Sequence, residues 1–230
     1  MASTSHRHLP MAAAGARPVW DRARGLVLGL AALAVILFAS SLGQTWWSFK
    51  LYAPQYPGGL TLDISLTGMG GDVKEIDLLN HYIGMGHLAE AAPVERRLAG
   101  WGVAAICVAT ILAFAFAGRR WNRLVALPAV AFPIVFLADS FYWLHRFGHE
   151  LNPKAPIRLA GFTPQMFGNG QIGQFETFAT PSLGFWLAVG GATCAIAAAF
   201  VRARVCSGCA RHDGCAVLCH RLMILPGAKR

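Results

Sequence analysis

Four long apolar runs constrain the fold of this 230-residue chain more than any other feature. Each is close to the ~20 residues that an α-helix needs to cross the hydrocarbon core of a bilayer. Charged residues make up only 13% of the chain, whereas a soluble domain carries about a quarter. The sequence therefore predicts an all-α integral membrane protein with four transmembrane helices, over residues 25–43, 99–117, 124–144 and 183–201.

Lys and Arg are distributed unevenly around these four runs. The segments 1–24, 118–123 and 202–230 hold 13 basic and two acidic residues, whereas 44–98 and 145–182 hold seven basic and eight acidic residues. Because cytoplasmic segments carry the excess of Lys and Arg, we predict a multi-pass protein of the cell's inner (cytoplasmic) membrane. Both termini are then cytoplasmic, both long loops lie outside, and the basic charge faces an anionic leaflet, so no nucleic acid is needed as a partner.

The first apolar run also has to be distinguished from a signal peptide, which likewise follows a basic start. It is long for the apolar region of a signal peptide, and no small-x-small cleavage site ends it before Gln44. This favours an uncleaved transmembrane helix.

The first outer segment, 44–98, is patterned like a small folded cap. Leu60, Leu62, Ile64 and Leu66 alternate with polar or small residues, which is typical of a strand with one buried face. Glycines at 68–71 can turn the chain back, and 72–79 continues as a second strand or as the start of a helix. We therefore expect a cap containing a β-hairpin. In the second outer segment, the proline and glycine content argues against one long helix, and NPKAP (152–156) and GNGQIG (168–173) read as irregular loop.

Candidate metal ligands fall in both outer segments. The stretch LNHYIGMGHL (79–88) carries His81, Met85 and His87, and His145 and His149 share one face if the third helix continues that far. Imidazole and thioether ligands favour copper over magnesium or calcium, and no cysteine lies in these segments. The alternative is that these side chains only pack or form hydrogen bonds.

Asp139 lies in the last turns of the third apolar run. An ionisable group inside a membrane is costly and marks a possible functional site, here a proton relay with His145 and His149. The alternative is an aspartate at the interfacial edge, hydrogen-bonded to Ser140 or to a neighbouring helix.

The cytoplasmic tail carries a second group of soft ligands. Zinc or an iron–sulfur centre would suit them, although the spacing is tighter than in the usual two-knuckle zinc sites. Metal-free reduced thiols and lipidated cysteines remain alternatives. The candidate ligands are Cys206, Cys209, His212, Cys215 and Cys219.

Three motifs resemble a family of bacterial four-span membrane proteins found near nitrous oxide reductase and other copper-dependent respiratory systems. They are LYAPQYPGGL (51–60), GDVKEIDLLNHYIGMGHL (71–88) and GFTPQMFGNGQIGQFETFATPSLG (161–184). NHYIGM (80–85) is also similar to a short motif of periplasmic copper chaperones of that system. The resemblance covers about Trp46 to Gly184 and leaves out the cysteine-rich tail. It implies a copper-linked role, carried by His81, Met85 and His87.

We therefore expect an accessory protein or subunit of a copper-dependent membrane system of the respiratory chain, which binds or passes copper at its outer face. No nucleophile–base pair or phosphate-binding glycine loop is apparent, so we expect no catalytic activity of its own. Its partners would be the lipid bilayer and other membrane or extracytoplasmic subunits. The alternatives are a purely structural subunit that docks partners through its outer loops, and, less favoured, a proton or ion transporter built around Asp139.

Overall fold

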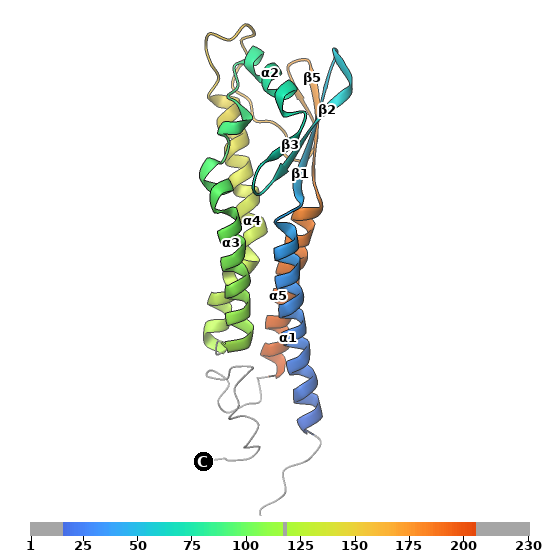
Figure 1. The fold of residues 1–230 in the computed structure, drawn as a ribbon, viewed down its shortest axis with the longest axis vertical. Helices are drawn as coiled ribbons and strands as arrows, with labels where there is room; N and C mark the ends of the chain where they lie inside the picture. Colours follow the sequence, from blue (N-terminus) through green and yellow to red (C-terminus); the bar gives the residue numbers. More distant parts are fainter. Residues whose placement is uncertain (1–15, 117–118, 206–230) are drawn as a thin grey trace, which may run out of the picture.

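The computed structural model describes residues 16–116 and 119–205, which form a bundle of long helices with a cap at one end. The cap lies at the end away from Ala16 and Val205, and it combines a β-sheet with a short helix (Figure 1). The elements, in chain order, are α1 (Ala16–Ser41), β1 (Thr45–Ala53), β2 (Tyr56–Ser65), β3 (Met69–Gly71), α2 (Val73–Ile83), η1 (Leu88–Glu90), α3 (Pro93–Ile111), the π-helical turn η2 (Leu112–Phe116), α4 (Arg119–His149), β4 (Gly168–Ile172), β5 (Phe175–Pro181) and α5 (Leu183–Val205).

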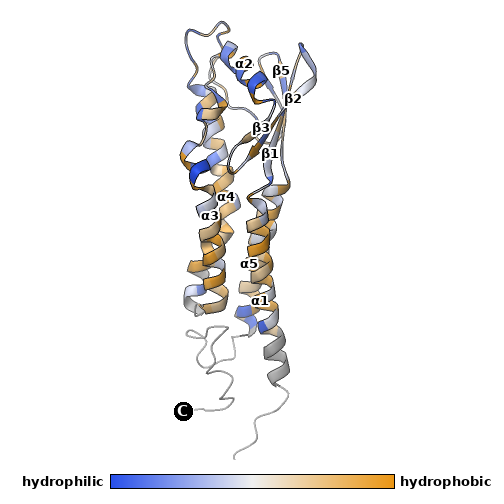
Figure 2. Cartoon of the chain, in the orientation of Figure 1, coloured by the Kyte–Doolittle hydropathy of each residue, from blue (hydrophilic) through white to orange (hydrophobic). Residues whose placement is uncertain are grey.

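Four helices in the described chain are long and apolar enough to cross a membrane, and each overlaps one of the four predicted apolar runs. Their apolar parts are Ala23–Ser41, Pro93–Phe116, Leu124–His149 and Leu183–Arg204. Figure 2 shows that hydrophobic residues dominate the helices, whereas the cap is mixed. The segment 118–123, predicted as a turn, is largely the first turn of α4, because that helix already begins at Arg119.

The cap contains the predicted β-hairpin, formed by β2 and β3, but it is larger than predicted, because this hairpin belongs to a five-stranded antiparallel sheet in the order β3-β2-β1-β5-β4. The chain is therefore not all-α. β2 lies where the alternating leucines predicted a strand, and 73–83 is a helix, one of the two predicted possibilities. The expectation of an irregular loop over GNGQIG was wrong, since β4 and β5 form a hairpin that adds to the sheet beside β1.

Two helices are joined directly to two adjacent inner strands of the sheet, the central strand β1 and its neighbour β5. β1 follows α1 and pairs with β5, which leads into α5, in a register from Trp47↔Pro181 to Tyr52↔Glu176. α1 and α5 approach closely through small residues, as membrane helices commonly do. A Cβ atom on Gly191 would lie 3.0 Å from the ring of Phe38. The result is one antiparallel two-segment unit that runs from the long apolar helices α1 and α5 into the cap.

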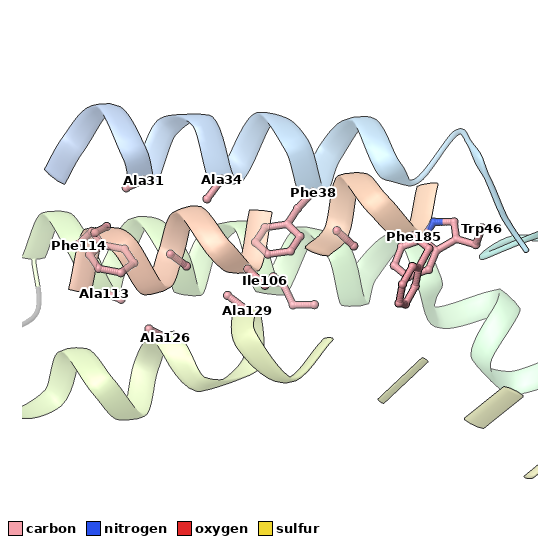
Figure 3. Packing of buried hydrophobic residues seen from close by; sticks show 14 of the residues in the cluster. Ala31, Ala34, Phe38, Trp46, Ile106, Ala113, Phe114, Ala126, Ala129 and Phe185 are labelled. Atoms are coloured by element: carbon pink, nitrogen blue, oxygen red, sulfur yellow. The ribbon is translucent and has the colours of Figure 1, made fainter. Parts of the chain in front are cut away.

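Trp46 lies where this unit passes from helix to sheet, and its side chain is completely buried (Figure 3). Its indole Nε1–H donates a hydrogen bond of 2.8 Å to the carbonyl oxygen of Ser41 at the end of α1. Its ring centroid lies 5.1 Å from that of Phe132, 4.6 Å from that of Phe136 and 6.2 Å from that of Phe185. One side chain therefore joins α1, β1, α4 and α5.

The opposite ends of three helices are joined by a polar contact. The carbonyl oxygen of Ala113, in the π-helical turn that follows α3, accepts hydrogen bonds from Asn122 Nδ2 at 2.7 Å and from Arg202 Nη1 at 2.9 Å. A π-helical turn disturbs the regular i→i−4 ladder, and here α4 and α5 supply donors to a carbonyl of that turn. The bundle is thus fastened at both ends, by Trp46 at the cap and by Ala113 at the other end.

Gly184 tests the packing around Trp46. A Cβ atom at position 184 would lie 2.4 Å from Trp46 Cδ1 and 3.0 Å from the carbonyl oxygen of Thr45. Because overpacking a well-filled core typically costs about 1–3 kcal/mol, we expect Gly184→Ala to lower the free energy of unfolding by about that amount. Thermal or denaturant unfolding of the purified protein in detergent measures this.

The matched control is Gly29→Ala in α1, where a Cβ atom would have no heavy atom within 4 Å. Because alanine has the higher helix propensity, this variant should be at least as stable as the natural protein. Equal stability of the two variants would contradict the tight packing around Trp46.

Candidate functional site

A partly open cavity of about 420 Å³ lies beneath the cap, lined by the sheet, α2 and the cap-side parts of α3 and α4. Its volume is within the range of about 300–1,000 Å³ that is typical of small-molecule sites. Most of its wall is apolar, and many lining residues belong to the two hydrophobic clusters that form the cores of the bundle and the cap. The cavity therefore lies at the interface between the cap and the helix bundle.

One face of α4 supplies a continuous wall of the cavity. Its lining residues recur at intervals of three and four, as expected for one side of an α-helix. The first and the last are fifteen residues apart, which corresponds to about 22 Å along the helix axis. The cavity is thus elongated, and its wall on α4 consists of Phe132, Val135, Phe136, Asp139, Ser140, Trp143, Leu144 and Phe147.

A few polar groups interrupt this apolar wall. Asp139 is half-buried on α4, and Glu95 and Arg96 line the cavity from the first turns of α3. The guanidinium group of Arg96 is held in place, since its Nε donates to the carbonyl oxygen of Ala92 at 3.3 Å and its Nη2 donates to that of Ala89. The predicted intramembrane acid therefore faces a cavity that also contains a second carboxylate and a guanidinium.

Asn80 is a lining residue that the search for metal ligands missed, although it begins the NHYIGM motif. It lies on the buried face of α2 with Ile76, Leu79 and Ile83, and only 6% of its surface is exposed. Its amide group makes no hydrogen bond to another residue within 16–116 and 119–205. The signal in the sequence was an uncharged polar residue at a position where the helical pattern requires an apolar one.

The three predicted ligands that follow Asn80 point to different places. His81 is exposed on α2, and His87 is 65% exposed with its Nδ1 3.6 Å from Asp77 Oδ2. Met85 lines the cavity and packs against the core of the cap. Gly84 causes this divergence, because its left-handed conformation (φ 81°) ends α2 and turns the chain.

His145 and His149 do come together at the cap-side end of α4. Their ring centroids are 3.9 Å apart, and His149 Nδ1–H donates to the carbonyl oxygen of His145 at 2.8 Å. His145 Nδ1 lies 3.0 Å from Thr163 Oγ1. Both rings are exposed, and α4 extends to His149 as their shared face required.

The loop after α4 fastens this end of the helix to the end of α2. The amide of Asn152 donates to the carbonyl oxygen of Gly84 at 2.8 Å, and the amide of Ile157 donates to that of Tyr82 at 3.0 Å. The two histidine-bearing segments are therefore neighbours. Even so, the described residues contain no group of three or more His, Cys, Asp or Glu side chains placed to hold one metal ion.

Three methionines of the two cap-forming segments line the same cavity: Met69, Met85 and Met166. Thioethers are soft ligands that suit Cu(I), but they are also adaptable apolar side chains that fill irregular cores. The tail ligands Cys206, Cys209, His212, Cys215 and Cys219 lie outside the described residues.

No protein-family model matches the chain, and searches of curated proteins and of solved structures likewise found no match.

Proposed function

We propose that this protein is a membrane-embedded accessory protein or subunit that binds an elongated, largely apolar molecule in the cavity beneath its cap. The observation that carries the proposal is the wall of the cavity on α4, which follows one helix face for about 22 Å from Phe132 to Phe147. A volume of about 420 Å³ is much larger than a single metal ion needs, and it suits an organic ligand.

The bilayer is the natural source of such a ligand. The lower wall, around Phe132 and Phe136, belongs to the candidate membrane span Leu124–His149, whereas the upper wall is formed by α2 and the sheet of the cap. A long apolar chain could therefore remain at membrane depth while its other end lies under the cap. Burial of apolar surface, at about 25 cal/mol per Å², would drive its binding.

Filling the cavity tests this proposal. Ala99 lines it from α3 and is half-buried, so Ala99→Trp should occupy part of the space. Photolabelling in nanodiscs, with a long-chain methyl ketone that carries a diazirine in its chain, should mark the cavity face of α4 in the natural protein. Because overpacking by the ligand costs about 1–3 kcal/mol, labelling of Phe136, a half-buried residue of the cavity wall, should fall about tenfold or more in the variant.

The control is Ala104→Trp, the same substitution on the same helix at an exposed position that does not line the cavity. Labelling of Ile134, an exposed residue of α4 outside the cavity wall, serves as the internal reference for contact with bulk lipid. Equal labelling of Phe136 and Ile134 that neither variant changes would contradict the proposal.

A second candidate function is the handling of copper at the proposed outer face, as an accessory protein of a copper-dependent membrane system. It is favoured by the three thioethers of Met69, Met85 and Met166 around one cavity, together with the motif resemblance. In this second candidate function, Cu(I) binds to the sulfur ligands in the cavity. The alternative ligands are the surface imidazoles of His81, His87, His145 and His149.

Competition with a Cu(I) chelator distinguishes these ligand sets. If thioethers bind the metal, Met85→Leu should weaken Cu(I) binding about tenfold or more with little change in stability, because Met and Leu have similar volumes. The double variant His81→Ala/His87→Ala should bind as the natural protein does. A loss confined to the histidine variant would reassign the site to imidazoles, and no competition by the natural protein would refute the copper function.

A further inference from the structure

We infer that Asn80 binds the polar end of the cavity's ligand, and that this ligand is a neutral carbonyl-bearing molecule with a long apolar chain. The inference rests on the proposed function, since it names the chemical class of the molecule in the cavity and the residue that recognises it.

The burial of Asn80 is the first observation. Nearly all buried side-chain amides in folded proteins are hydrogen-bonded, and each exception calls for a partner outside the chain. Asn80 lines the cavity, is 6% exposed and makes no side-chain hydrogen bond within 16–116 and 119–205. The amide atoms of Asn80 are not among the described side-chain atoms that are both fully buried and unpaired, so the amide faces the accessible space of the cavity, where water or a ligand can form hydrogen bonds with it.

The position of Asn80 gives the ligand a direction. The segment that follows Asn80 reaches the upper end of the α4 wall, where a Cβ atom on Gly86 would lie 3.3 Å from the ring of Phe147. Phe132, at the other end of that wall, contacts Trp46 inside the bundle. A ligand with its polar group at Asn80 therefore extends its chain towards Phe132 and the membrane, as a lipid of the same leaflet would.

The charges along the cavity restrict the polar group. Glu95 and Asp139 are acidic, and Arg96 is the single basic residue among the lining side chains. Arg96 also donates its hydrogen bonds to the carbonyl oxygens of Ala89 and Ala92. This balance disfavours a carboxylate or phosphate, whereas a neutral carbonyl can accept the N–H of the Asn80 amide. Both the ester of an acylglycerol and the carbonyl of an isoprenoid quinone have this chemistry.

The test compares two photoprobes of equal length in nanodiscs that contain the full chain: the diazirine methyl ketone and the corresponding diazirine hydrocarbon. Labelling of the half-buried wall residue Phe136 is measured relative to the exposed Ile134. One hydrogen bond to Asn80 should give the ketone a preference of roughly five- to tenfold in the natural protein. Asn80→Leu should abolish that preference and keep the labelling by the hydrocarbon, whereas Asn169→Leu, on the exposed edge strand β4, should leave the preference unchanged.

Each other outcome has a distinct meaning. If the natural protein labels equally with both probes, or if the ketone preference survives in Asn80→Leu, the role of Asn80 is refuted while the proposed function stands. If neither probe marks the cavity face above the Ile134 reference, the proposed function itself fails. Mass spectrometry of an organic extract of the purified natural protein then distinguishes the two possible ligands, an acylglycerol and a redox-active quinone. Finding an anionic lipid as the bound species would overturn the assignment of a neutral ligand.

Discussion

The burial of Trp46 is the constraint on which the arrangement of cap and bundle depends. Its indole N–H closes the end of α1, and its ring packs against aromatic side chains of α4 and α5. A tryptophan is buried favourably only when its N–H finds a partner, and the carbonyl of Ser41 provides one. This fixes the direction in which β1 leaves the membrane helix, and with it the plane of the whole sheet.

The cavity follows from that geometry. The adjacent strands β1 and β5 are joined directly to α1 and α5, so the sheet stands over one side of the bundle, while α3 and α4 rise beside it (Figure 1). α2 crosses between the two parts, and the cavity beneath it is lined by side chains of both the cap and the bundle. The same arrangement directs Met85 and Asn80 into the interior and leaves the four histidines of the cap at the surface.

Much of the fold was predictable from sequence, because hydropathy identifies membrane helices over some twenty residues. β2 could be predicted from its alternating leucines. β4 and β5 could not be placed, because their partner β1 lies more than a hundred residues earlier, although Phe175, Thr177 and Ala179 alternate as buried residues. The residue types suggested histidine ligands. Whether these side chains converge depends on the backbone conformation at Gly84, which is left-handed and directs Met85 and His87 to different places. The cavity could not be predicted from the sequence either, because its wall combines residues of α4 with residues of the cap that are distant in sequence.

The identity of whatever fills the cavity is the central question, and a cryo-electron microscopy map of the full chain in nanodiscs formed from its own membranes answers it most directly. We expect a tube of non-protein density along the face of α4, beginning near Asn80 and continuing past Phe147 and Asp139 towards Phe132. A cavity closed by movement of α2 against α4, or one that holds only isolated water peaks, would contradict the account.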